Sequence, residues 1–133
     1  MAKVLTYRGM TEEQIKGMDS NTFMKQVTSR ERRTMQRTNQ FPMYKKLLLK
    51  VRKIKASGKA DKTIKTRVRS GVIVPEWLGL TFGVHNGKEY VPVQITVDKL
   101  GWRLGDFSHT TKRVTHSGPG VGATRGSKFV PLK

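Results

Sequence analysis

Arginine is the residue type best placed to do chemistry in this sequence, within the segment "RERRTMQR". Arg30, Arg33 and Arg37 are spaced i, i+3 and i+7, which puts them on one face of a helix. A solvated helix face is the ordinary alternative, but only one acid, Glu31, is available to pair with four arginines. A guanidinium group matches the geometry of phosphate oxygens. We therefore expect phosphate binding by Arg30, Arg32, Arg33 and Arg37.

A second candidate is the glycine-rich segment "HSGPGVGATRGSKF", residues 116–129. Residues 118–123 match the G-x-G-x-x-A form of the dinucleotide fingerprint, which must open a helix and precede a second strand. Pro119 stands inside the motif, however, and only ten residues follow it. A P-loop is excluded as well, because the segment reverses the final Lys-Ser order. The segment is better interpreted as a basic tail that uses Arg125 and Lys128.

The other polar residues form no catalytic or metal-binding constellation. His85, His109 and His116 lack the i, i+4 or cysteine-paired spacing of a metal site, and the chain has no cysteine. No pair of carboxylates has the spacing of an acid and a base, and no serine or threonine sits in a nucleophile elbow. We therefore expect no enzymatic activity, no cofactor and no metal.

The overall charge favours a polyanionic partner. The 133 residues include 27 Lys and Arg against 9 Asp and Glu, which gives a net charge of +18. The excess is spread along the chain, with 15 basic and 4 acidic residues in 1–60 and 12 and 5 in 61–133. Nucleic acid is the expected partner, because neutralising phosphates releases counterions. An anionic membrane surface is the competing partner.

The sequence shows no targeting or membrane-spanning signal. Its start, "MAKVLTYRGM", lacks the apolar core of a signal peptide, and no run approaches about 20 apolar residues. We therefore expect a cytoplasmic protein that does not bind a membrane.

The first 60 residues predict a basic helical region. Thr11 to Gln14 have the spacing of a capping box, and Gly17 weakens the short helix that it starts. Asp19 or Ser20 can cap a second helix, which we expect to run on into the arginine-rich segment.

The strongest helix prediction follows Pro42, a residue suited to the first helical position. Apolar residues keep a helical period and lysines and arginines lie mostly opposite, over residues 42–55. A basic amphipathic helix of this kind could lie on a membrane surface or bind a partner helix. It has no tryptophan or phenylalanine anchor, and basic residues continue far beyond it, so a core helix is favoured.

Beyond a polar turn at 56–61 the period changes to that of strands. "KTIKTRVR" alternates weakly, and "LTFGVHNGKEYVPVQI" alternates on both sides of Asn86-Gly87. Asn-Gly favours a two-residue type I′ turn, and Pro92 predicts an edge or bulged strand. Thr96 or Asp98 can cap one last short helix.

The sequence therefore predicts an α+β fold, with N-terminal helices packed with a small sheet that contains the Asn-Gly hairpin. An extended basic C-terminal tail completes it. We expect one globular domain overall, made of a basic helical region (1–60), an α+β core with the hairpin (61–108) and a flexible glycine-rich basic tail (109–133).

Three stretches carry a resemblance to a known family. They are "KTIKTRVRSGVIVPEWLGLTFGVHNGKEYVPVQI", "LGWRLGDF" and "HSGPGVGATRGSKFVPLK". The chain resembles the small-subunit ribosomal protein family called S-nineteen in the bacterial scheme. Residues 62–116 resemble the universal core of that family. The arginine-rich N-terminal helices and "GVGATR" resemble its archaeal and eukaryotic branch, whose eukaryotic member is called S-fifteen.

The resemblance implies a structural protein of the ribosome that binds small-subunit, 16S-type rRNA in the head of the subunit. It implies ribosomal protein S-thirteen as a neighbour and a tail that reaches toward the decoding region and its tRNAs. Carried over by position, the further rRNA-binding residues are Lys65, Arg67, Arg69, His85, Asn86, Gly87, Lys88, Lys112, Arg113, His116, Arg125 and Lys128.

The chain departs from the family pattern at three places. Trp102 stands where the family usually has a histidine, and Thr111 stands where it usually has an arginine. Val68 lies where an aromatic residue, cysteine or serine is usual. Contacts of these three residues therefore cannot be carried over from the resemblance.

Overall fold

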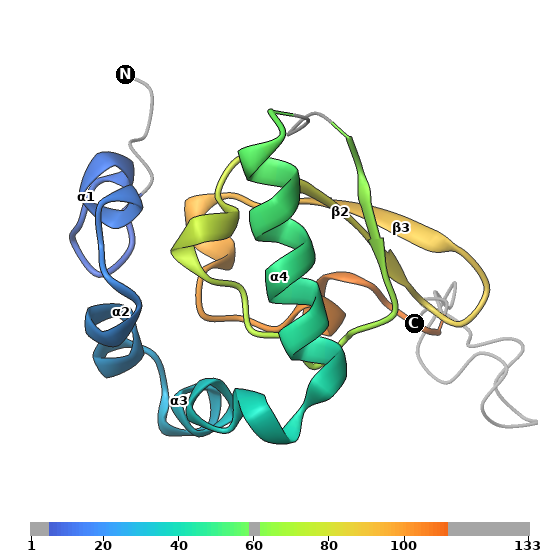
Figure 1. The fold of residues 1–133 in the computed structure, drawn as a ribbon, viewed down its shortest axis with the longest axis horizontal. Helices are drawn as coiled ribbons and strands as arrows, with labels where there is room; N and C mark the ends of the chain where they lie inside the picture. The colour runs from blue at the N-terminus through green and yellow to red at the C-terminus, as the bar shows by residue number, and fades with distance from the viewer. Residues whose placement is uncertain (1–5, 59–61, 112–133) are drawn as a thin grey trace, which may run out of the picture.

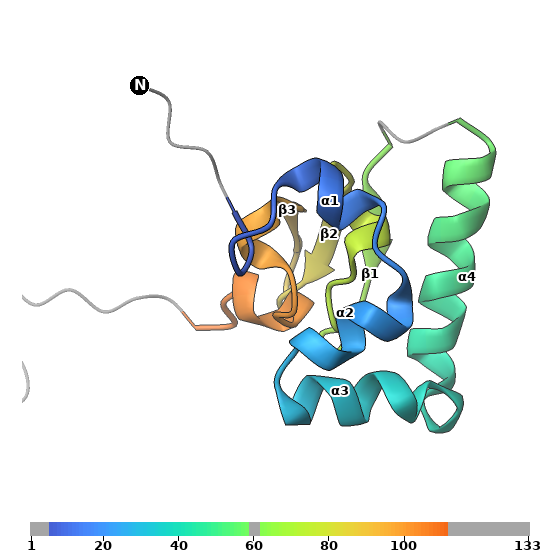
Figure 2. The ribbon, with the colours of Figure 1, turned by 90° about the vertical axis from the view of Figure 1, so that its left-hand side faces the viewer.

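The structure, a computed structural model, describes residues 6–58 and 62–111 and has the α+β architecture predicted from the sequence. The α-helices are α1 (Glu12–Lys16), α2 (Ser20–Gln26), α3 (Ser29–Gln36) and α4 (Pro42–Ala56). The strands are β1 (Ile64–Thr66), β2 (Thr81–His85) and β3 (Tyr90–Gln94). Short 3₁₀ turns are η1 (Thr38–Gln40), η2 (Pro75–Trp77), η3 (Val97–Lys99) and η4 (Leu104–Phe107). Helices α1 to α3 follow one another along one end of the molecule, and α4 crosses beside the sheet (Figures 1 and 2).

The N-terminal helices begin where the sequence places their caps. The Thr11 N–H donates to Gln14 Oε1 at 3.1 Å, and Asp19 Oδ2 accepts from the Asn21 N–H at 3.2 Å. The expectation that the second helix continues into the arginine segment is wrong. Val27 and Thr28 are extended, with ψ values of 163° and 159°, so α2 ends and α3 begins as a separate helix.

The sheet has three strands in the order β1-β2-β3. β1 runs parallel to β2, and β2 runs antiparallel to β3. β3 is therefore an edge strand, as Pro92 predicts, and Pro92 itself lies opposite Gly83. β1 is shorter than the alternation in "KTIKTRVR" suggests. It stops at Thr66 because Thr66 Oγ1 accepts a hydrogen bond from the Val68 N–H at 3.0 Å, which turns the chain out of the strand.

The hairpin forms, but the predicted two-residue type I′ turn does not. His85 pairs with Tyr90, so four residues, 86–89, make the loop. Gly87 has a positive φ of 108°, whereas Asn86 is not among the residues in that region. The Asn86 side chain instead closes the loop, since its Oδ1 accepts from the Lys88 and Glu89 N–H groups at 2.9 and 2.8 Å.

The predicted last short helix is also different in the structure. The residues form two 3₁₀ turns, η3 and η4, separated by an extended segment. That segment pairs with the chain before η2: the Ile73 N–H donates to Trp102 O at 2.9 Å, and the Gly101 N–H donates to Ile73 O at 3.1 Å. The pairing interrupts the helix because these backbone groups bond across the fold and not along the chain.

One hydrophobic cluster joins the helices to the sheet, with buried side chains from Ile15 to Leu104. Trp77 lies at its centre, with ring centroids of Phe82 and Tyr44 at 4.9 and 6.4 Å. Burial raises the pKa of Tyr44, whose hydroxyl donates to Val72 O at 3.1 Å. The apolar side of α4 is therefore part of the core, as the favoured interpretation of that helix predicts.

Candidate nucleic-acid interface

The face of α3 brings three of the predicted arginines together. Arg30, Arg33 and Arg37 are exposed and line one groove of about 460 Å³. Phe41 lines the same groove and is 44 % exposed. Guanidinium groups beside an exposed aromatic ring can bind phosphates and stack on a nucleotide base. This surface, called here the α3 groove, fits the phosphate-binding prediction.

Arg32 belongs to the same helix but faces the protein. Its Nε donates to Met24 O at 2.8 Å, and its Nη2 donates to the carbonyl oxygens of Lys25 and Val27 at 3.1 Å each. These are carbonyls at the end of α2, where a helix leaves acceptors unsatisfied. The prediction of phosphate binding by Arg32 gains no support, since most of its donors hold the corner between α2 and α3.

A partly buried ion pair fixes α3 against the rest of the domain. Arg103 Nε lies 3.4 Å from Glu31 Oε1, and the two side chains are 19 % and 14 % exposed. Arg103 Nη2 also donates to Thr34 Oγ1 at 3.0 Å. Sequence reasoning missed this pair, although Glu31 was visible as the one acid in the arginine segment. The pairing removes that acid from the exposed arginines of the α3 groove.

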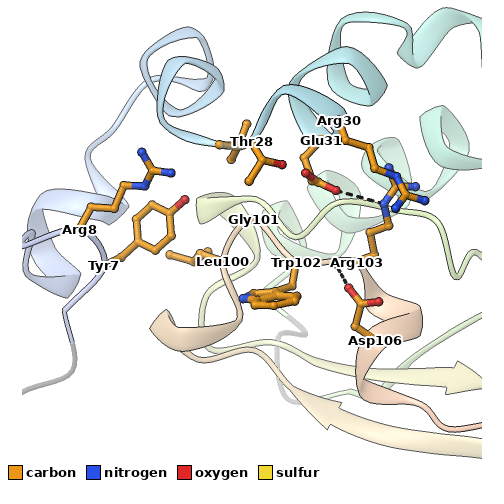
Figure 3. A pocket seen from close by; sticks show the side chains of 11 residues that line it. Tyr7, Arg8, Thr28, Arg30, Glu31, Leu100, Gly101, Trp102, Arg103 and Asp106 are labelled. Carbon is orange, nitrogen blue, oxygen red and sulfur yellow. Dashed lines mark hydrogen bonds and ion pairs between the residues drawn. The ribbon is translucent and has the colours of Figure 1, made fainter.

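A second pocket adjoins the α3 groove and shares Arg30 and Arg103 with it. Its volume is about 400 Å³, and it lies between the Tyr7–Met10 turn, the corner before α3 and the segment after η3. In Figure 3, Tyr7 and Arg8 lie on one side, Arg30, Glu31 and Arg103 on the other, and Trp102 between them. Trp102 is 58 % exposed. This pocket is called here the Trp102 pocket.

A separate basic groove runs between α4 and β1. Exposed Lys65 and Arg67 line it together with Lys46, Lys50 and Tyr90. The Lys65 ammonium lies 5.6 Å from the Tyr90 ring centroid, a cation–π contact. The sequence placed Lys46 and Lys50 on the outer side of the helix, but only the fold shows that they join Lys65 and Arg67.

Arg69 is turned inward, unlike Lys65 and Arg67. Its Nη1 donates to His85 O at 2.7 Å, and its Nη2 donates to the carbonyl oxygens of Gly105 and Ser108 at 3.0 and 2.6 Å. These bonds join the segment after β1 to the end of β2 and to η4. The predicted RNA contact of Arg69 therefore gains no support, because both terminal nitrogens bind the protein's own backbone.

The hairpin tip is shaped by its own side chains. His85 Nδ1 accepts from the Gly87 N–H at 3.1 Å, and its ring packs edge-on against Tyr90 with centroids 4.9 Å apart. His85 and Asn86 thus set the shape of the loop, and Gly87 and Lys88 are exposed at its tip. The backbone N–H groups of residues 86–89 all have acceptors within the loop, so the exposed Lys88 ammonium is the group at the tip that suits a phosphate.

The remaining predicted residues lie outside the described part of the chain. These are Lys112, Arg113, His116, Arg125 and Lys128, together with the glycine-rich segment.

Within residues 6–58 and 62–111, no group of three or more His, Asp or Glu side chains could hold a metal ion. No helix of that part is long and apolar enough to cross a membrane.

A comparison with known protein families points to the same kind of partner, a nucleic acid, as the basic grooves do. The family model for ribosomal protein S19 matches residues 22–116, which is more than half of the chain. Members of this family are structural proteins of the small ribosomal subunit in the cytoplasm, where they bind rRNA and take part in translation, and they are not enzymes. The chain therefore belongs to the ribosomal protein S19 family.

Proposed function

We propose that the chain binds small-subunit rRNA in the head of the subunit through two surfaces, the α3 groove and the α4–β1 groove. The observation that supports this most strongly is the pairing of Glu31 with Arg103. It leaves Arg30, Arg33 and Arg37 exposed around one groove. Such a concentration of positive charge is stabilised by a polyanion.

The contacts of these surfaces are to the sugar–phosphate backbone. A-form RNA has a deep, narrow major groove that side chains do not read, so shape and phosphate contacts dominate its recognition. The arginines of α3 follow a helix face, and Lys46, Lys50, Lys65 and Arg67 surround a second groove. Lys88 at the hairpin tip adds a third point of contact.

We further propose that ribosomal protein S-thirteen is a neighbour in the subunit head and that residues 109–133 extend toward the decoding region and its tRNAs. The support is the resemblance of "HSGPGVGATRGSKFVPLK" to the family and the basic, glycine-rich character of that segment. Lys112, Arg113, His116, Arg125 and Lys128 are the proposed RNA contacts there. Crosslinking from this segment in assembled small subunits, with and without tRNA, tests the proposal; crosslinks that never include tRNA or decoding-region rRNA would contradict it.

The test of the two surfaces is the salt dependence of binding to a 16S-type rRNA fragment that comprises the head of the small subunit. Replacing Arg30, Arg33 and Arg37 by Ala removes about three phosphate contacts. The slope of log K against log salt is negative, and it should then become less steep by about 2 to 3 units. A flat salt response of the unaltered protein would contradict phosphate binding itself.

A matched control removes the same charge elsewhere. Lys16 and Arg52 are paired with Glu12 and Glu76, and Lys99 donates to Gln94 O at 2.6 Å. Replacing these three cations by Ala should leave the slope close to that of the unaltered protein. Equal losses in the two triple variants would show that net charge alone, and not the α3 groove, determines binding.

A further inference from the structure

We propose that the Trp102 pocket binds one unpaired nucleotide of the rRNA, with its base stacked on the Trp102 indole and the phosphates on its two sides facing Arg8 and Arg30. The inference rests on the proposed rRNA binding and adds a specific site to it. The pocket, of about 400 Å³, falls in the range of small-ligand sites, roughly 300–1,000 Å³.

Trp102 is held as a platform. Its carbonyl accepts the Ile73 N–H at 2.9 Å, and its N–H donates to Lys99 O at 3.3 Å. The preceding Gly101 has a φ of 76°, and a Cβ there would lie 3.2 Å from the Tyr7 hydroxyl, so any other residue would be strained at this position. The backbone is thus fixed while 58 % of the residue faces solvent. An exposed indole on a fixed turn is the arrangement that stacks unpaired bases.

The charges around the pocket suit the two phosphates that flank one nucleotide of an RNA strand. Its lining holds three arginines and two carboxylates. Both carboxylates are engaged within the protein: Glu31 pairs with Arg103, and Asp106 Oδ2 accepts the Arg103 N–H at 2.9 Å. Arg8 and Arg30 are exposed and remain at opposite sides of Trp102 (Figure 3). A nucleotide lying on the indole would place its 5′ phosphate on the side of one of these arginines and its 3′ phosphate on the side of the other.

Arg8 is presented by an unusual turn. Tyr7 and Met10 exchange two backbone hydrogen bonds of 3.1 and 3.0 Å, and the residues between them have positive φ values, 52° for Arg8 and 82° for Gly9. Arg8 is the one non-glycine residue with positive φ in the described chain. A side chain in this region is strained, and strain of this kind concentrates at functional positions. The turn keeps Arg8 beside the Tyr7 ring, with its guanidinium carbon 6.0 Å from the centroid.

An unpaired nucleotide fits better than a duplex. In a duplex the faces of the bases are covered by their neighbours, so an exposed indole gains nothing from it. The Trp102 pocket also shares the lining residues Arg30 and Arg103 with the α3 groove, so the two lie side by side and one RNA strand can contact both.

The first test uses the fluorescence of the full-length protein. Trp77 is fully buried and Trp102 is exposed, so quenching by an added ligand reports mainly on Trp102. Single-stranded oligoadenylate, oligocytidylate or oligouridylate of 12 nucleotides, roughly one single-strand site, should quench the emission. Inorganic polyphosphate of equal charge and a 12-base-pair RNA duplex should bind without this quenching. Binding of all three single strands without quenching, or equal quenching by polyphosphate, would overturn the inference.

The second test uses the rRNA fragment of the subunit head and three variants. Trp102→Ala should weaken binding by about 5- to 150-fold, the range measured for loss of one base–aromatic stack. The salt slope should stay unchanged, because no phosphate contact is lost. Trp102→Phe should retain most of the affinity, and Trp102→His, the residue usual in the family, should lie between the two.

The outcomes separate this inference from the proposed function. Unchanged affinity of Trp102→Ala, with a steep salt slope, would overturn the nucleotide site and leave the two grooves intact. A flat slope for the unaltered protein would overturn the grooves themselves. Trp102 shielded from iodide only after another ribosomal protein is added, and not by the rRNA fragment, would assign the pocket to a protein partner and overturn the inference.

Discussion

Arginine occurs in two different settings in this molecule, on the exposed face of α3 and at the junction of the sheet with η4. Arg30, Arg33 and Arg37 are exposed around a groove. Arg69 lies where the end of β2 and the end of η4 leave carbonyl oxygens facing the same point, and it binds three of them. The difference lies in the backbone acceptors within reach and not in the local sequence.

Arg32 shows that the two settings can be adjacent. It lies one residue from Arg33, yet it faces the end of α2 and donates to three carbonyls there. A helix turns by 100° per residue, so neighbouring arginines face different surroundings. The arginine cluster in this sequence is therefore a mixture of exposed side chains and side chains that bind the protein's own backbone.

Removing Arg69 should change the stability of the protein more than removing any of the other arginines discussed. Arg69→Ala leaves partly buried carbonyls without a donor and should lower the free energy of unfolding by about 3 kcal/mol. Arg67→Ala, two residues away and exposed, is the control and should change it by less than about 0.5 kcal/mol. Urea unfolding measures both. Equal stability of the two variants would show that Arg69 is not a brace.

Removing Arg103 tests the pair that separates Glu31 from the exposed arginines. Arg103→Ala should cost about 2 kcal/mol, less than a fully buried pair because both side chains keep some solvent contact. A double-mutant cycle with Glu31→Gln measures the coupling, which should reach at least about 0.5 kcal/mol. Additive effects of the two changes would mean that the pair does not fix α3.

Arg32 and Arg33 allow an inward-facing and an exposed arginine of the same helix to be compared directly. Arg32→Ala should lower the free energy of unfolding by about 1 to 2 kcal/mol and leave the salt slope of rRNA binding nearly unchanged. Arg33→Ala should do the reverse, with a stability change below about 0.5 kcal/mol and a slope lowered by about 1. If Arg32→Ala lowered the slope as much as Arg33→Ala, the division between the two arginines would be wrong.

Arg8 gives the smallest expected change in stability. Arg8→Gly relieves a left-handed conformation and should leave the free energy of unfolding unchanged or raise it by up to about 1 kcal/mol. Binding of the rRNA fragment of the subunit head should weaken at the same time. A destabilised Arg8→Gly variant would show that the side chain serves the fold and not the ligand.

Local signals in the sequence predicted several elements correctly. The cap at Thr11, the start of α4 at Pro42 and the edge position of Pro92 each depend on a few adjacent residues. The prediction of a two-residue turn at Asn86-Gly87 was wrong, because the Asn86 side chain accepts hydrogen bonds from two backbone N–H groups and stabilises a longer loop. The tight turn with two positive φ values lies instead at Arg8-Gly9, which sequence analysis did not identify as a turn.

The candidate site was predictable only in part. The i, i+3, i+7 spacing identified the exposed face of α3, since it depends on helix geometry alone. The inward role of Arg69 was not predictable, because its acceptor on Ser108 lies 39 residues away. The Trp102 pocket was missed for the same reason: it joins three segments that approach one another only in the folded chain.

The bonds from Arg69 to Gly105 and Ser108 also have a consequence for the chain during its synthesis. A growing chain is released from its N-terminus, and domains fold as their segments become available. The helices α1 to α4 are made long before the carbonyls that Arg69 binds. Until Ser108 has left the translating ribosome, the nascent chain therefore lacks one of the three carbonyl acceptors of Arg69, and the junction that Arg69 joins cannot be completed.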